Sequence, residues 1–153
     1  MTAVADHRPH PVLPLPAPVP PSARDLVASS ARGLVEAAVA PSAATRFAAA
    51  HLAALRAAAA LLAARARPAR GRGRLRSVWV VLPEVAPELG EWAQFFAAGA
   101  GKRAAAEAGL RGVVSEREAD DLVRDAEAFL ARVARLLGVP HQPLLGGPSA
   151  AVS

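Results

Sequence analysis

Apolar residues recur at intervals of three and four along most of the chain, the spacing of one face of an α-helix. The pattern predicts a first helix over residues 22–40, opened by Ser22 with Asp25 three positions later and stopped by Pro41. Its expected apolar face is Val27, Ala31, Leu34 and Ala38. A second helix is expected over residues 42–66, with an apolar stripe at Ala48, Leu52, Leu55, Ala59 and Leu62.

The most regular stripe lies over residues 78–96 and comprises Val78, Leu82, Val85, Leu89, Trp92 and Phe96. Residues 78–81 alone would suit a strand, because they are rich in valine and include a tryptophan. The helical spacing continues past them, so a helix is the better interpretation. Pro83 and Pro87 lie within the stripe and should kink this helix or divide it in two. Residues 102–108 can continue it.

A turn over residues 109–114 separates this region from the last predicted helix. Ser115 and Glu118 have the spacing of a capping box, and Gly138 with Pro140 ends the run. The buried face should be Leu122, Ala126, Phe129, Val133 and Leu136. About four helices, or five if the third is divided, predict an all-α antiparallel bundle over residues 22–138.

Both ends of the chain lack this periodicity. Residues 1–21 alternate proline with small apolar residues, which favours an extended or disordered segment. Residues 139–153 are expected to form a flexible tail. Residues 65–76 combine proline and glycine with arginines and should form a mobile loop, in which the basic positions are Arg65, Arg67, Arg70, Arg72, Arg74 and Arg76.

These arginines are candidates for nucleic-acid binding, because each guanidinium can neutralise one backbone phosphate. No aromatic residue stands among them to stack on a base, which weakens the case for recognising single strands. The alternative is a solvated linker in an arginine-rich chain, whose net charge is +5.

Composition narrows the chemistry further. Of the 153 residues, 53% are hydrophobic but only 4% are aromatic, so the core should depend on closely approaching, alanine-rich helices. The chain has no cysteine, which excludes disulfides, thiolate metal sites and a cysteine nucleophile. The apolar run at residues 47–64 contains His51 and Arg56 and is interpreted as too polar for a membrane span. With no export signal recognised in residues 1–21, a soluble cytoplasmic protein is expected.

Acidic residues offer a possible metal site, which we consider weak. Glu84, Glu88 and Glu91 recur at helical spacing, and further carboxylates fall in residues 116–121. No Glu-x-x-His pair accompanies them, and acids at a helix start are explained by the helix dipole. We therefore expect no metal and no cofactor.

Several blocks of sequence resemble a known family. They are the alanine-rich run over residues 46–64, the arginine segment after it, and the segments 77–82 and 85–93, which read SVWVVL and VAPELGEWA. In the order and residue composition of these blocks, over about residues 24–137, the chain resembles the SAV-type HEPN domain proteins of actinomycetes. The resemblance implies a helical bundle of the higher eukaryotes and prokaryotes nucleotide-binding superfamily, commonly dimeric. Its members include RNA-cleaving toxins and also inactive or nucleotide-binding relatives.

Ribonucleases of that superfamily place an arginine four to six residues before a histidine, and Arg46 with His51 fits that spacing. Histidine can move a proton near neutral pH, and arginine can stabilise charge on the phosphate. Five steps along a continuous helix, however, place the two side chains about 140° apart. The superfamily motif also lies in a late helix, whereas this pair lies early. Arg135 and His141 also approximate the spacing, and we interpret that match as coincidence.

The leading hypothesis is therefore a non-catalytic, HEPN-like interaction module that forms a homodimer and contacts nucleic acid or another protein. One alternative is a metal-independent ribonuclease that uses His51 and Arg46 across a dimer. Another is a purely structural, partner-binding bundle. No membrane contact is expected.

Overall fold

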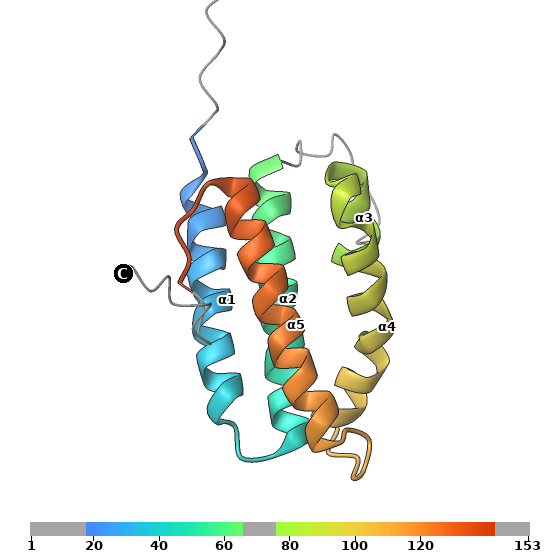
Figure 1. Cartoon of the computed structure of the whole chain (residues 1–153). Coiled ribbons are helices and arrows are strands. Elements are labelled where there is room, and N and C mark those ends of the chain that lie inside the picture. The colour runs from blue at the N-terminus through green and yellow to red at the C-terminus, as the bar shows by residue number, and fades with distance from the viewer. Residues whose placement is uncertain (1–17, 66–75, 143–153) are drawn as a thin grey trace, which may run out of the picture.

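The computed structural model of the chain describes residues 18–65 and 76–142. Within these ranges the chain forms five α-helices and one short 3-10 helix, and no strand (Figure 1). The helices are α1 (Pro21–Val39), α2 (Ala43–Arg65), α3 (Val78–Val85), α4 (Gly90–Glu107) and α5 (Glu116–Leu137), with the 3-10 helix η1 (Pro87–Leu89) between α3 and α4. The predicted all-α bundle is confirmed, in its five-helix form. The predictions for residues 1–17, 66–75 and 143–153 lie outside the described residues.

α1 and α2 form an antiparallel pair, as Figure 1 shows. α3 runs in the direction of α2, and after η1 the chain turns back so that α4 runs antiparallel to α3, with Trp79 of α3 stacked on Phe96 of α4. α5 returns beside α2 and runs in the same direction as it. α2 contacts all four other α-helices and is therefore the central element of the bundle.

The helix ends agree with the sequence signals at three points and differ at one. Ser42 accepts a hydrogen bond from the backbone N–H of Thr45 at 3.1 Å, and Ser115 with Glu118 forms the predicted capping box. Gly138 ends α5 with a positive φ of 67°, a conformation that glycine adopts without strain. α1 instead begins at Pro21, and no side chain caps it. Proline suits a first helical position because its missing N–H would have no partner there.

The proline-rich stripe is divided as expected, but only one of the two prolines divides it. Pro83 lies inside α3, whereas Ala86, with φ −143° and ψ 76°, leaves the helical conformation just before Pro87. The residue before a proline is driven out of the helical region by the proline ring. The chain restarts through η1 and continues as α4 to Glu107, which agrees with the predicted continuation over residues 102–108.

The predicted stripe of α2 is in the wrong register. Its five members are only partly buried, and the buried residues are instead Phe47, Ala50, His51, Ala53, Ala54, Ala57, Ala58, Ala60 and Leu61. Because α2 has neighbours on several sides, alanines face the closest helices while Leu55 and Leu62 pack at the core's edge. A similar shift occurs in α1, where Ala37 is buried and Ala38 is exposed.

α1 and α2 approach each other through small residues. The Ser30 hydroxyl donates a buried hydrogen bond of 2.7 Å to the carbonyl of Ala53. Gly33 faces the same place, where an added Cβ would lie 3.5 Å from the Cβ of Ala53 and 3.3 Å from Arg56. Interiors packed at this density have little room for extra atoms.

α2 is also long and apolar enough, by length and composition alone, to cross a membrane. The interpretation of this segment as too polar for a span is therefore wrong on those two criteria. Half of the apolar stretch of α2 that meets these criteria is buried inside the bundle. The central position of α2 accounts for its apolar character.

Enlarging a buried alanine of α2 tests this packing. We expect Ala57→Leu to lower the free energy of unfolding by about 1–3 kcal/mol, because the extra atoms displace a neighbouring helix. Ala57 is fully buried, whereas Ala63 in the same helix is exposed and provides the control Ala63→Leu. Urea unfolding followed by circular dichroism measures both. Equal stability of the two variants would contradict the tight packing of α2.

Candidate functional site

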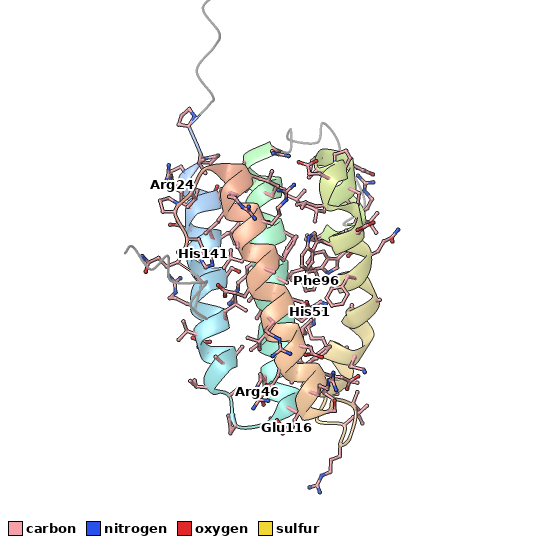
Figure 2. The ribbon with its side chains drawn as sticks, in the orientation of Figure 1. Arg24, Arg46, His51, Phe96, Glu116 and His141 are labelled. Atoms are coloured by element: carbon pink, nitrogen blue, oxygen red, sulfur yellow. The ribbon has the colours of Figure 1, made fainter. Side chains whose placement is uncertain are left out.

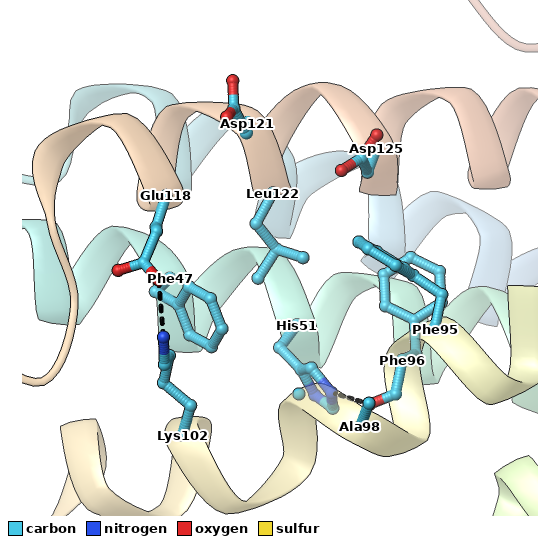
Figure 3. A pocket seen from close by; sticks show the side chains of 11 residues that line it. Phe47, His51, Phe95, Phe96, Ala98, Lys102, Glu118, Asp121, Leu122 and Asp125 are labelled. Atoms are coloured by element: carbon cyan, nitrogen blue, oxygen red, sulfur yellow. Dashed lines mark hydrogen bonds and ion pairs between the residues drawn. The ribbon is translucent and has the colours of Figure 1, made fainter.

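A pocket of about 430 Å³ opens between α4 and α5, with α2 as its floor (Figure 3). The floor residues are Phe47 and His51. The residues contributed by α4 are Phe95, Phe96, Ala98, Gly99 and Lys102, and those contributed by α5 are Glu118, Asp121, Leu122 and Asp125. This volume lies within the range of small-ligand sites, so it is the first candidate for a binding site.

His51 lies at the bottom of this pocket with no solvent-exposed surface. Its Nε2 lies 2.8 Å from the carbonyl oxygen of Phe96 (Figure 3). Its Nδ1 lies 3.4 Å from the guanidinium of Arg103. A carbonyl can only accept, so Nε2 carries the proton and donates it, and Nδ1 is left to accept from Arg103. His51 therefore links α2 to α4.

The surroundings of His51 favour its neutral form. Burial lowers the pKa of the imidazole most strongly, and this outweighs the hydrogen bond to Phe96, which raises the pKa. The positive charge of Arg103 lowers the pKa further, and Glu107 has the smallest effect, which raises it. The rings of Trp79 and Phe96 lie edge-on to it, each with its centroid at 6.0 Å. Both nitrogens of His51 are thus occupied by groups of the bundle itself.

Arg46 lies at one end of the bundle and serves as a tie between helices. Its guanidinium donates to Glu116 at 2.7 Å, to Asp120 at 3.0 Å and to the carbonyl of Ala40 at 3.2 Å. These bonds join the start of α2 to the start of α5 and to the end of α1. The hydrogen bond to Glu116 contributes most to raising the pKa of Arg46 above its ordinary value.

The structure does not bring Arg46 and His51 together within one chain. His51 faces α4 and the aromatic residues, whereas Arg46 faces the carboxylates at the start of α5 (Figure 2). This arrangement follows from their separation around α2, as the helical geometry predicts. The polar atoms of the two side chains bind different partners.

Of the six candidate arginines in residues 65–76, only the first and the last are among the described residues. Arg65 pairs with Glu88 at 3.0 Å, and Arg76 pairs with Glu84 at 2.6 Å. The bond to Arg76 lowers the pKa of Glu84, whereas the pKa of Glu88 is lowered first by its own backbone and then by Arg65. The other four, Arg67, Arg70, Arg72 and Arg74, lie outside the described residues.

Of the three glutamates considered for a metal site on this segment, Glu84 and Glu88 are therefore paired with arginines. Among residues 18–65 and 76–142, no group of three or more histidine and carboxylate side chains is placed to hold a metal ion.

Sequence reasoning named His51, and placed Glu118 and Asp121 among the carboxylates at a helix start, but it did not single out Phe95 or Asp125 and did not predict that these residues line one pocket. Phe95 is 46% exposed at its edge, and Glu118, Asp121 and Asp125 follow one another along α5. The spacing of these carboxylates, three and four residues, was a usable signal for one helix face. The pairing of that face with Phe95 across the pocket depends on tertiary structure.

The model of the SAV-type HEPN family (HEPN_SAV_6107) matches residues 37–134, which is well over half of the chain. The matched region begins near the end of α1 and includes all of α2 to α4 and most of α5. The protein is thus a member of a HEPN family, and the chain belongs specifically to the SAV-type HEPN domains. No curated protein and no solved structure matches it.

The buried state of His51 predicts a pH dependence of stability. Its pKa is lowered on folding, so the unfolded chain takes up a proton at a pH where the folded chain does not. The stabilising contribution is complete above the unfolded value of about 6.5 and is lost as the pH falls below it. We expect His51→Gln, which keeps a donor for Phe96 but cannot titrate, to flatten the fall in urea midpoint between about pH 7 and 5.5.

The matched control is His141→Gln, because His141 lies elsewhere and contacts Glu127 at 3.0 Å. In the His141→Gln variant the urea midpoint should still fall with pH over this interval, because His51 is unchanged. If wild type and His51→Gln lose stability in parallel over the same interval, the buried neutral histidine is the wrong description.

Proposed function

We propose that this HEPN domain is a non-catalytic interaction module, which acts by binding another macromolecule. The observation that carries the proposal is the state of His51. Its imidazole is fully buried and hydrogen-bonded to Phe96 and Arg103. A general base must lie within hydrogen-bonding reach of the proton that it removes. His51 could meet that requirement only if α2 and α4 separated.

The contacts of Arg46 support the same proposal. A catalytic arginine must leave its guanidinium available for the phosphate charge that develops during cleavage. The guanidinium of Arg46 already binds Glu116, Asp120 and a backbone carbonyl. A phosphate would have to displace two carboxylates, and the ends of three helices would lose their connection.

Incubation of the purified chain with RNA in the presence of a chelator tests the absence of cleavage. We expect wild type and His51→Gln to leave the RNA equally intact. Glutamine supplies an N–H donor for the Phe96 carbonyl, so we expect the His51→Gln variant to keep the fold. RNA cleavage by wild type that His51→Gln abolishes would establish the ribonuclease alternative and overturn the proposal.

A contact between the arginine segment and nucleic acid is a second proposal. Arg65 and Arg76, which stand on either side of residues 66–75 in the sequence, pair with Glu88 and Glu84. The two anchoring guanidiniums are already paired. Phosphate contacts would therefore fall to the arginines between them, which are Arg67, Arg70, Arg72 and Arg74.

Salt dependence measures this contact. We expect the binding of single-stranded RNA to weaken when Arg70, Arg72 and Arg74 are changed to glutamine, with the slope of log K against log salt reduced by about 2. Arg65→Gln and Arg76→Gln should change the slope much less, because their charges are matched by glutamates. A triple variant with the wild-type slope would assign the arginine segment to a linker.

A further inference from the structure

The pocket between α4 and α5 is an open side of the bundle. α4 and α5 each pack along α2, but they make little backbone contact with one another. Figure 3 shows Glu118 and Leu122 of α5 pointing across the space toward α4, with Phe47 and His51 of α2 between the two helices, whereas Asp121 points away from the space. The pocket therefore has two helical walls and a floor, and its fourth side is solvent.

Its inner surface is apolar. Phe47, Phe96 and Leu122 line it, together with the ring of His51. Phe95 extends this surface to the outer edge, where 46% of the side chain is exposed although it contacts Phe96 with ring centroids 5.0 Å apart. An exposed aromatic residue continuous with an apolar pocket is typical of a protein contact surface.

The outer edge formed by α5 is acidic. Glu118, Asp121 and Asp125 occupy one face of the helix and extend over about 10 Å, nearly two helical turns. Lys102 is the single cation among the lining residues, so one positive and three negative charges give a net charge of −2. The whole chain carries +5, so the sign of the charge is reversed at this surface.

These charges are unequally compensated. Glu118 is paired with Lys102 at 2.5 Å, and Asp121 contacts Arg124 and lies 3.9 Å from Arg117. Within the described part of the chain, Asp125 has no hydrogen bond or ion pair. Burial raises its pKa, and the neighbouring Asp121 raises it further, while Arg124 opposes this effect. A cation placed beside Asp125 from outside would compensate a charge that the bundle leaves poorly neutralised.

We propose that this surface binds a basic amphipathic helix of a partner protein. The apolar side chains of that helix enter the pocket beside Phe95, and its Lys or Arg side chains pair with Asp121 and Asp125. A helix fits because two parallel walls bound the site and the carboxylates recur at helical intervals. Three carboxylates disfavour a nucleic-acid backbone at the same place. This inference rests on the proposed interaction function and specifies its partner.

A designed peptide serves as the probe. A labelled helix of about 18 residues carries leucines at intervals of three and four, with lysines on both flanks. A second peptide has glutamate in place of every lysine. In fluorescence anisotropy with the full chain, we expect the glutamate peptide to bind at least about tenfold more weakly, because its charges repel those of α5.

Two pairs of variants locate the binding. The double variant Asp121→Asn with Asp125→Asn should bind the lysine peptide about three- to tenfold more weakly. The control Asp25→Asn, at an exposed position of α1, should leave the affinity unchanged. Ala98→Leu, in the pocket wall, should also weaken binding. Ala97→Leu is its control, since Ala97 is exposed on α4 and does not line the pocket. Circular dichroism verifies that every variant is folded.

Equal affinity for the two peptides, or an unchanged affinity in the double asparagine variant, would overturn this inference. So would self-association that Ala98→Leu abolishes, because a second copy of the chain would then be the occupant. Competition by RNA for the same peptide site would likewise assign the surface to nucleic acid. None of these results concerns RNA cleavage, so the inference can fail while the proposed non-catalytic function stands.

Discussion

The structure depends on the close packing of α2 against its neighbours. Alanine side chains let the helix backbones approach, and this contact replaces the bulky anchors that a chain with few aromatic residues lacks. The buried hydrogen bond from Ser30 to Ala53, and the absence of a side chain on Gly33, let α1 pack equally close to α2. Every other helix is then positioned by its contact with α2.

The few aromatic residues are concentrated on the opposite side of α2 from this contact. Trp79, Trp92, Phe96 and Phe129 pack together, with the rings of Trp79 and Phe96 stacked at 5.0 Å. Large rings hold α3 and α4 farther from α5 than alanines would. His51 joins this cluster through the Phe96 carbonyl, so the polar contact holds α4 on α2 where the packing is least compact. The pocket is a consequence of this difference between the two sides.

The charged groups of the bundle differ in how completely they are paired. Arg46, with Glu116 and Asp120, is used to join helix ends, and the glutamates of α3 and η1 bind the arginines at either end of residues 65–76. Of the carboxylates of α5 beside the pocket, Glu118 and Asp121 have cationic partners, whereas Asp125 has no hydrogen bond or ion pair within the described residues. Membership of the SAV-type HEPN family accounts for the bundle, whereas the distribution of paired and unpaired charge supports a binding role.

The sequence by itself determined the elements that depend on local signals. The capping box at Ser115, the stop at Gly138 and the division before Pro87 follow from backbone geometry and were predictable, as was the all-α class. Tertiary structure alone decided which face of α2 is buried, because an alanine-rich helix has no single strongly apolar side and its neighbours select one. It also decided the environment of His51 and the pocket, since Phe96, Arg103 and the carboxylates of α5 are distant in sequence and meet only when the helices pack around α2.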